Sequence, residues 1–179
     1  PRSLTAALPI VAYNRSAAQP GINHLDLVVV AGELLAIVGP SGHGKSTLVQ
    51  LLTRFYDVQD GAVRLDGTDV RELAQHELRR NVGVVLQDNV LFSGSILDNL
   101  RLAAPQASDA PLIAAARALG ADAVLARLPQ RYHSDVRPLG APLSPRQRQP
   151  VCLVRASLAH PAVLVPAAAT PPVHVPTAR

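Results

Sequence analysis

The feature that most constrains this chain is the segment at residues 39–47, which reads GPSGHGKST. It fits the pattern G-x-x-x-x-G-K-[ST], in which a glycine-rich backbone turns its N–H groups toward phosphate. An apolar run at residues 34–38 precedes it and predicts a buried strand, and residues 46–52 follow with a helical pattern. The motif requires this strand–loop–helix setting, because the helix N-terminus adds a positive dipole end beside the phosphate. We therefore expect a phosphate-binding loop, the P-loop.

The residue types of this loop predict separate roles. The Lys45 ammonium is expected to reach the β- and γ-phosphates of a nucleotide, and the Ser46 hydroxyl to ligate Mg²⁺. Lys45 is also the only lysine in the chain. The predicted nucleotide-contacting residues of the loop are Gly39, Ser41, Gly42, Gly44, Lys45, Ser46 and Thr47.

Composition favours one domain over residues 1–179, with a truncated, proline-rich tail at 166–179 that holds no regular structure. Apolar residues make up 48% of the chain, which is enough for a substantial core. No apolar run reaches the ~18 residues of a membrane span, and no secretory signal is visible. The lone Cys152 lies in an apolar run, which predicts a small core residue in a reducing compartment.

The net charge of +4 and the pI near 10 invite a nucleic-acid hypothesis. The arginines are scattered, however, and aromatic residues are only 3% of the chain, so the sequence offers no stacking platform for bases. We therefore expect no nucleic-acid partner.

Strand patterns and helix patterns follow one another along the chain, which predicts an α/β fold. We expect a P-loop NTPase core with a mostly parallel sheet, an N-terminal antiparallel β portion and an inserted helical lobe. The expected strands are 10–13, 25–30, 61–65, a buried strand at 82–86 and a last buried strand at 162–165. The expected helices are 73–80, 95–102, 109–127 and one that begins at Ser144. Residues 14–21 are expected to form a turn-rich loop.

The helical lobe is expected at about residues 89–150. Ser108 is a plausible N-cap, and Gly120 is a plausible C-cap between two helical pieces. Ser144 and Gln147 have the spacing of a capping box, in which the two residues at a helix start bond reciprocally.

Residues 84–100, which read VVLQDNVLFSGSILDNL, resemble a second motif of a known family together with the P-loop. Nearly the whole chain is similar to the nucleotide-binding domain of ATP-binding-cassette (ABC) transporters of the exporter type. The resemblance implies ATP and Mg²⁺ as ligands. It also implies that Tyr13 stacks on adenine, and that Gln87 contacts Mg²⁺ and the attacking water. The alternatives are an aromatic core residue at Tyr13 and an exposed residue at a strand end at Gln87.

The resemblance weakens at the family signature L-S-G-G-Q. Leu143, Ser144 and Gln147 match it, but Pro145 and Arg146 replace its glycines. Pro145 lacks the N–H that a phosphate would use, and Arg146 adds bulk where the backbone must approach closely. In the alternative hypothesis, the Arg146 side chain itself binds phosphate.

Two further family positions have lost their acids. After the strand at 162–165 the family has an Asp that holds Mg²⁺ and a Glu that activates water; here Ala167 and Ala168 align with them. No Asp or Glu follows Asp135, so no later acid can substitute. Loss of a general base typically costs about 10²–10⁴-fold in rate. We therefore expect no intact catalytic residue and impaired hydrolysis, while nucleotide binding persists.

Three lesser features complete the comparison with the family. Residues 134–140 resemble the exporter loop that contacts the membrane domain, with Pro138 in place of its usual acid. Pro150 falls inside the last predicted helix, where it would cost roughly 3 kcal/mol. His174, near the position where the family's dimer-contacting loop ends, is expected to be an exposed tail residue.

The resemblance implies two partners: the transmembrane domain of an exporter, and a second nucleotide-binding domain in a head-to-tail homodimer or heterodimer. It places the chain at the cytoplasmic face of a membrane, peripheral through that membrane domain. Two alternatives remain open: a non-hydrolysing regulatory nucleotide-binding subunit, and a decayed cassette fragment. A soluble ABC ATPase that acts on nucleic acid is disfavoured by residues 84–100.

Overall fold

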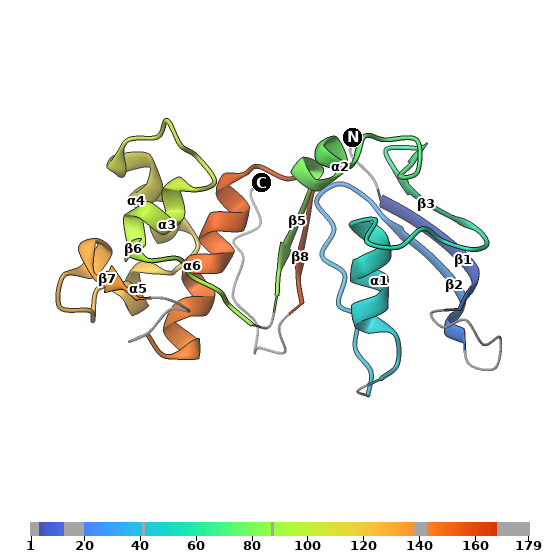
Figure 1. Cartoon of the computed structure of the whole chain (residues 1–179), viewed down its shortest axis with the longest axis horizontal. Coiled ribbons are helices and arrows are strands. Elements are labelled where there is room, and N and C mark those ends of the chain that lie inside the picture. Colours follow the sequence, from blue (N-terminus) through green and yellow to red (C-terminus); the bar gives the residue numbers. More distant parts are fainter. Residues whose placement is uncertain (1–3, 13–19, 41, 87, 138–142, 168–179) are drawn as a thin grey trace. The chain divides into compact units, whose positions relative to one another are not determined.

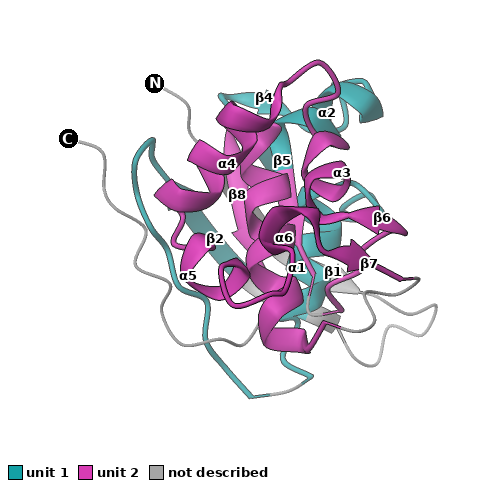
Figure 2. Cartoon of the chain, turned by 90° about the vertical axis from the view of Figure 1, so that its left-hand side faces the viewer, with its two compact units in different colours: residues 1–82 teal, residues 83–179 magenta. Residues whose placement is uncertain are grey.

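The computed structural model describes residues 4–12, 20–40, 42–86, 88–137 and 143–167. The chain forms two compact units, residues 1–82 and 83–179, which carry different colours in Figure 2. The prediction of a single domain stays a prediction.

The first unit contains a four-stranded antiparallel sheet in the order β2-β1-β3-β4 (Figure 1). Its strands are β1 (Leu4–Ala12), β2 (Pro20–Val29), β3 (Ala62–Leu65) and β4 (Thr68–Asp69). The predicted N-terminal antiparallel portion is thereby confirmed. The predicted loop at 14–21 is wrong at its end, because β2 already begins at Pro20 and pairs there with Ala12. A second correction is the length of β1, which is longer than the predicted strand because it pairs with both β2 and β3.

Two helices, α1 (Lys45–Leu52) and α2 (Gln75–Asn81), belong to the same unit. Helix α1 buries three leucines on one face, as the helical pattern after the loop predicts. The buried residues of this unit come mainly from both helices and from β1, β3 and the loops between them, and include Leu4, Leu48, Leu51, Leu52, Val58, Val63, Leu65, Val70 and Leu78.

The buried strand predicted at residues 34–38 is wrong. The structure assigns no strand there, and Leu34 and Val38 are 85% and 88% exposed. An apolar run becomes a buried strand only where neighbouring strands satisfy its backbone groups and cover its side chains. Within the described residues no strand pairs with this run.

The second unit combines a parallel pair of strands with a helical portion. Strand β5 (Val82–Val85) pairs with β8 (Val163–Pro166), and β6 (Gly94–Ser95) pairs with β7 (Asp135–Val136). The helices are α3 (Ile96–Arg101), α4 (Asp109–Ala118), α5 (Asp122–Leu125), the 3₁₀ helix η1 (Arg131–His133) and α6 (Pro145–Leu158). This mixture of parallel strands, antiparallel strands and helices confirms the predicted α/β class.

The core of the second unit lies among its helices. Its fully buried members include Ile96, Leu100, Leu112, Leu125, Val136, Val151 and Val154. Cys152 belongs to the same cluster, as predicted, and burial raises the pKa of its thiol. Strand β8 is not the buried strand that its apolar run predicts. Its residues alternate between half-buried and exposed, because among the described residues β5 is its sole partner strand.

The predicted capping residues lie at helix ends, but not all of them make a side-chain capping bond. Gly120 has a left-handed φ of 71° and separates α4 from α5, as predicted. Ser108 occupies the N-cap of α4 but makes no side-chain capping bond. A bonded cap is found at the start of α3, where the Ser95 Oγ accepts from the Asp98 N–H at 3.0 Å and the Ser95 N–H donates to Asp98 Oδ2 at 2.8 Å. None of the helices in the described part of the chain is long and apolar enough to span a bilayer.

Candidate functional site

The glycine-rich loop depends on backbone conformations that glycine adopts without strain. Gly42 and Gly44 have φ values of 83° and 78°, in the left-handed region. Gly44 is the N-cap of α1, and its carbonyl accepts the Leu48 N–H at 2.9 Å. A residue with a Cβ would be strained at either position by the left-handed φ, where the turn leads the loop into the helix.

Lys45 is the first residue of α1, and its side chain folds back along the loop. Its Nζ donates to the carbonyl oxygens of Gly39 and Pro40 at 2.6 and 2.7 Å. The ammonium therefore lies over the start of the loop while the backbone N–H groups of the first helical turn lie at its end. No acidic residue lies in that turn. Both features favour an anion at this place.

Two hydroxyl residues of the loop, Ser46 and Thr47, lie within this first turn. Ser46 is exposed and Thr47 is half-buried. Among the described residues, no group of three or more His, Cys, Asp and Glu side chains could hold a metal ion. The side-chain oxygens that the described part of the loop offers to a cation are thus the hydroxyls of Ser46 and Thr47, which fit a Mg²⁺ ion only poorly without oxygens from elsewhere.

Four predicted site residues, Tyr13, Ser41, Gln87 and Ala168, lie outside the described residues, and so does His174. The described loop residues Gly39, Gly42, Gly44, Lys45, Ser46 and Thr47 lie together in the first unit. The remaining described candidates lie in the second unit.

Ala167 directly follows strand β8 and is held beside the end of β5. Its N–H donates to the Val85 carbonyl at 2.8 Å. Because β5 and β8 are parallel, their carboxyl ends lie at the same edge of the pair, where polar site residues gather in α/β proteins. Ala167 is exposed there and presents a methyl group, which cannot bind a cation.

The start of α6 has the predicted capping arrangement. The N–H and the Oγ of Ser144 both donate to Gln147 Oε1 at 2.8 Å. Leu143 is buried just before the helix, and Pro145 takes its first position. Arg146 is exposed at this end. The helix continues through Pro150 to Leu158, so the interior proline is accommodated rather than excluded.

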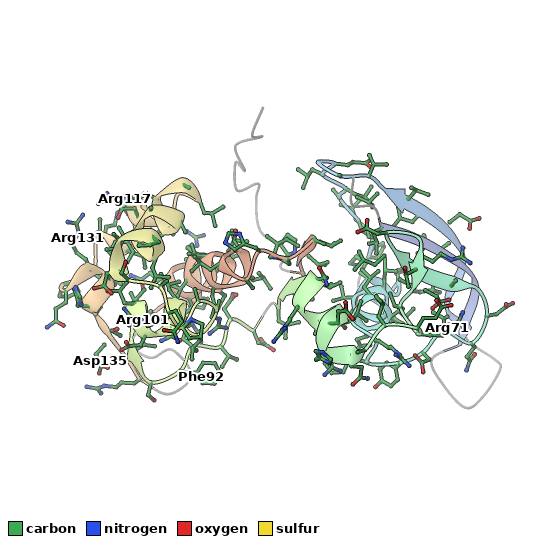
Figure 3. All side chains as sticks on the ribbon, turned by 90° about the horizontal axis from the view of Figure 1, so that it is seen from above. Arg71, Phe92, Arg101, Arg117, Arg131 and Asp135 are labelled. Atoms are coloured by element: carbon green, nitrogen blue, oxygen red, sulfur yellow. The ribbon has the colours of Figure 1, made fainter. Side chains whose placement is uncertain are left out.

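The segment that follows Gln87 is fastened by a residue that the sequence patterns did not single out. Asn99 on α3 is 1% exposed; its Oδ1 accepts the Phe92 N–H at 2.8 Å, and its Nδ2 donates to the carbonyls of Phe92 and Ser95 at 2.9 and 3.0 Å. A polar residue on the apolar face of the predicted helix at 95–102 was the available signal. Phe92 itself stays 57% exposed (Figure 3).

A second bond fastens the same segment to α6. Arg155 Nη2 donates to the Val90 carbonyl at 3.0 Å, and its guanidinium lies 5.7 Å from the centroid of the Phe92 ring. Residues 90–92 are therefore held by two helices of the second unit. This places the segment after Gln87 on a fixed support.

Replacing Asn99 by Ala should destabilise the second unit by about 1–3 kcal/mol, because the Phe92 N–H and two carbonyls lose their partners. Amide hydrogen exchange should report faster exchange at Phe92, and denaturant unfolding should report the lost stability. Asn81→Ala is the control, since Asn81 makes one exposed bond to the Glu77 carbonyl. Unchanged exchange at Phe92 in Asn99→Ala would contradict the assigned role.

Comparisons with known proteins agree on one family. A family model described as ABC transporter matches residues 22–166. The ABC transporter ATP-binding protein YfiC of Bacillus subtilis is 40% identical over 155 residues, which cover 87% of this chain and 26% of that protein. A multidrug efflux ATP-binding/permease protein of Mycobacterium bovis is 43% identical over 169 residues, which cover 92% of this chain and 14% of that protein.

A solved structure agrees with these relatives. The structure of a bacterial Atm1-family ABC exporter with ATP bound superposes with a TM-score of 0.82 at 38% identity, and covers 92% of this chain and 28% of that one. The chain thus spans about a quarter or less of the first curated relatives it matches.

Proposed function

Because this chain belongs to the ABC transporter family, we propose that it is the ATP-binding domain of an exporter and holds MgATP at residues 39–47. The observation that carries the proposal is the arrangement at the start of α1. Two glycines in the left-handed region lead the loop into the helix N-terminus, and the Lys45 ammonium lies over the loop. This arrangement suits the triphosphate of a nucleotide.

The nucleotide would be contacted at both ends. Tyr13 would stack on the adenine ring, and Lys45 would bind the β- and γ-phosphates. Ser46 and Gln87 are the protein's proposed oxygen donors for Mg²⁺. They fit the ion only weakly, since the position after β8 carries the Ala167 methyl group, and most of its ligands would be phosphate oxygens and water.

Hydrolysis is proposed to be impaired in this chain's own site. The position of the general base is Ala168, and an alanine cannot take a proton from water. Pro145 and Arg146 would also hinder the signature that closes over the site of a second nucleotide-binding domain. A homodimer would therefore be nearly inert, whereas a heterodimer with an intact partner would keep one slow site.

The proposed setting is the cytoplasmic face of a membrane, with the chain coupled to the transmembrane domain of an exporter. A second candidate is a regulatory nucleotide-binding subunit that uses ATP to stabilise a dimer. It is favoured by one observation, the methyl group of Ala167 at the edge shared by β5 and β8. The two candidates differ in whether a dimer with a competent partner turns over ATP.

The chain alone should bind ATP and release no phosphate above the level of its Lys45→Ala variant. The reason is that binding uses the loop, whereas turnover needs the acids that Ala167 and Ala168 replace. The rate of hydrolysis is measured as phosphate release at saturating MgATP. Turnover of about 1 s⁻¹ or faster that depends on Lys45, in the ordinary range of enzymes, would contradict impaired hydrolysis.

A further inference from the structure

Helix α1, whose first residue is Lys45, ends with a non-glycine residue in the left-handed conformation. The Phe55 N–H donates to the Gln50 carbonyl at 2.8 Å, and the Arg54 N–H donates to the Leu51 carbonyl at 3.1 Å. These two bonds form a Schellman motif, in which the residue after the C-cap takes the left-handed conformation. That residue is Arg54, with φ of 52°.

Arginine is a costly choice for this position. Glycine adopts a left-handed φ without a steric penalty, whereas a residue with a Cβ is strained there. Strain of this kind persists where surrounding contacts determine the conformation, and it gathers at functional sites. The conformation of Arg54 is therefore held by the contacts around it rather than by its own backbone preference.

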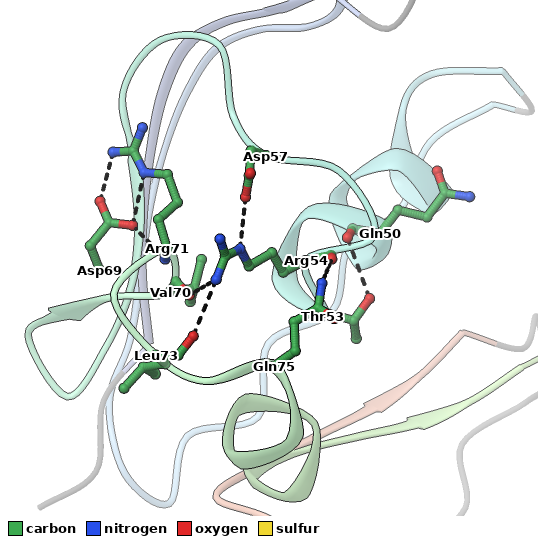
Figure 4. A network of polar contacts seen from close by, with 9 residues as sticks. All are labelled: Gln50, Thr53, Arg54, Asp57, Asp69, Val70, Arg71, Leu73 and Gln75. Atoms are coloured by element: carbon green, nitrogen blue, oxygen red, sulfur yellow. Dashed lines mark hydrogen bonds and ion pairs between the residues drawn. The ribbon is translucent and has the colours of Figure 1, made fainter.

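The contacts of that side chain connect the end of α1 to a distant segment. Arg54 Nε donates to Asp57 Oδ1 at 2.8 Å, and Nη1 donates to the Leu73 carbonyl at 3.1 Å, with a longer contact of 3.5 Å to the Val70 carbonyl (Figure 4). The Gln75 side-chain amide approaches the Arg54 carbonyl at 3.5 Å. One arginine thus joins α1 to the turn that precedes α2.

We propose that Arg54 is a positioning residue for the nucleotide site and acts through Lys45. Helix α1 has only eight residues and is too short to be stable by itself, so its orientation depends on its packed leucines and on its fixed ends. Its N-terminal end carries the loop and Lys45. Its C-terminal end is fixed by Arg54, so release of that end would allow the helix, and Lys45 with it, to shift relative to bound phosphate.

This inference rests on the proposed function, because it concerns the affinity of the loop for ATP. A merely structural role would lower stability without a specific loss of affinity. Arg71 is the matched control for that alternative. It makes a bidentate pair with Asp69 at 3.0 and 2.7 Å (Figure 4) and donates to the Gly61 carbonyl at 3.1 Å; these bonds lie within the first unit, and none of them reaches α1.

The test compares Arg54→Ala, Arg54→Gly, Arg54→Lys and Arg71→Ala in the full chain. A fluorescent ATP analogue is titrated well below each variant's unfolding midpoint, and the midpoint itself is measured by circular dichroism. Arg54→Ala and Arg54→Gly should weaken binding about 3- to 30-fold. Arg54→Lys should recover part of that loss, and Arg71→Ala should leave affinity within about twofold of the unmodified chain even where it lowers the midpoint.

Arg54→Gly is the sharpest variant, because it removes the guanidinium and the left-handed strain together. It should be more stable than Arg54→Ala and yet bind the analogue as weakly. If the Arg54 variants do not fold, Asp57→Asn replaces them, because it removes the exposed charged partner of Arg54. It should lower the affinity for the analogue by less than the Arg54 variants do, and an unchanged affinity would count against the inference.

The outcomes separate the two proposals. Equal affinity of the Arg54 variants and the unmodified chain would overturn this inference, as would an equal loss in Arg71→Ala. Absence of Lys45-dependent binding in the unmodified chain would instead overturn the proposed function, and this inference with it.

Discussion

Replacing Lys45 by Ala should weaken ATP binding by roughly 100-fold or more. Lys45 is the sole lysine of the chain, and its ammonium is the charged donor that the structure places over the loop, at 2.6 and 2.7 Å from two loop carbonyls. A bond from a charged donor to a phosphate oxygen is stronger than one between neutral groups. The fold should survive, because the side chain is only half-buried and bonds exposed carbonyls.

Titration with a fluorescent ATP analogue measures this loss directly. Arg127→Ala is the control for charge, since Arg127 is exposed in the second unit and its removal also takes away one positive charge. It should leave the affinity unchanged at physiological salt. If Lys45→Ala binds the analogue as tightly as the unmodified chain does, residues 39–47 are not the nucleotide site.

The sequence predicted most reliably those features that local chemistry determines. The glycines of the loop predicted a turn into a helix, and Gly42 and Gly44 adopt left-handed φ values before α1. Ser144 and Gln147 predicted a capping box, which the start of α6 shows. In each case the residues that decide the conformation lie within a few positions of each other.

Burial was harder to predict because it depends on what lies beside a segment. The apolar run at 34–38 has the composition of a buried strand, yet no described strand pairs with it. The last apolar strand, β8, is half-exposed for the same reason. Composition indicates which side chains favour a core, whereas the partners that form the core come from distant parts of the chain.

Arg54 and Asn99 escaped prediction for a related reason. The carbonyl that Arg54 binds at 3.1 Å belongs to Leu73, nineteen residues later, so no local pattern indicates the contact. Asn99 is a polar residue on the apolar face of a predicted helix, but this signal does not name its partner, and its role appears only when Phe92 lies against it. Both residues act through backbone groups, whose positions depend on the fold and not on the local sequence.

Restoring the two acids should restore cation-dependent nucleotide binding before it restores hydrolysis. Ala167→Asp combined with Ala168→Glu should make ATP affinity depend more strongly on Mg²⁺, since a carboxylate would replace a methyl group after β8. Ala167 is exposed, so the new side chain need not be forced into a core. Affinity measured with Mg²⁺ and with EDTA gives the effect, and Lys45→Ala in the same background should remove it.

Hydrolysis should return only when the signature is repaired as well. With the acids in place, Pro145→Gly and Arg146→Gly would supply a backbone N–H and clear the bulk at the start of α6, where Ser144 and Gln147 already form the cap. Phosphate release should rise by much more than the product of the two separate repairs, because these groups act as one unit on one phosphate. The double-acid variant could fold and yet bind ATP with the same affinity in Mg²⁺ and in EDTA. This result would show that residues 167 and 168 do not lie beside the bound phosphates, and the proposed cause of impaired hydrolysis would then be wrong.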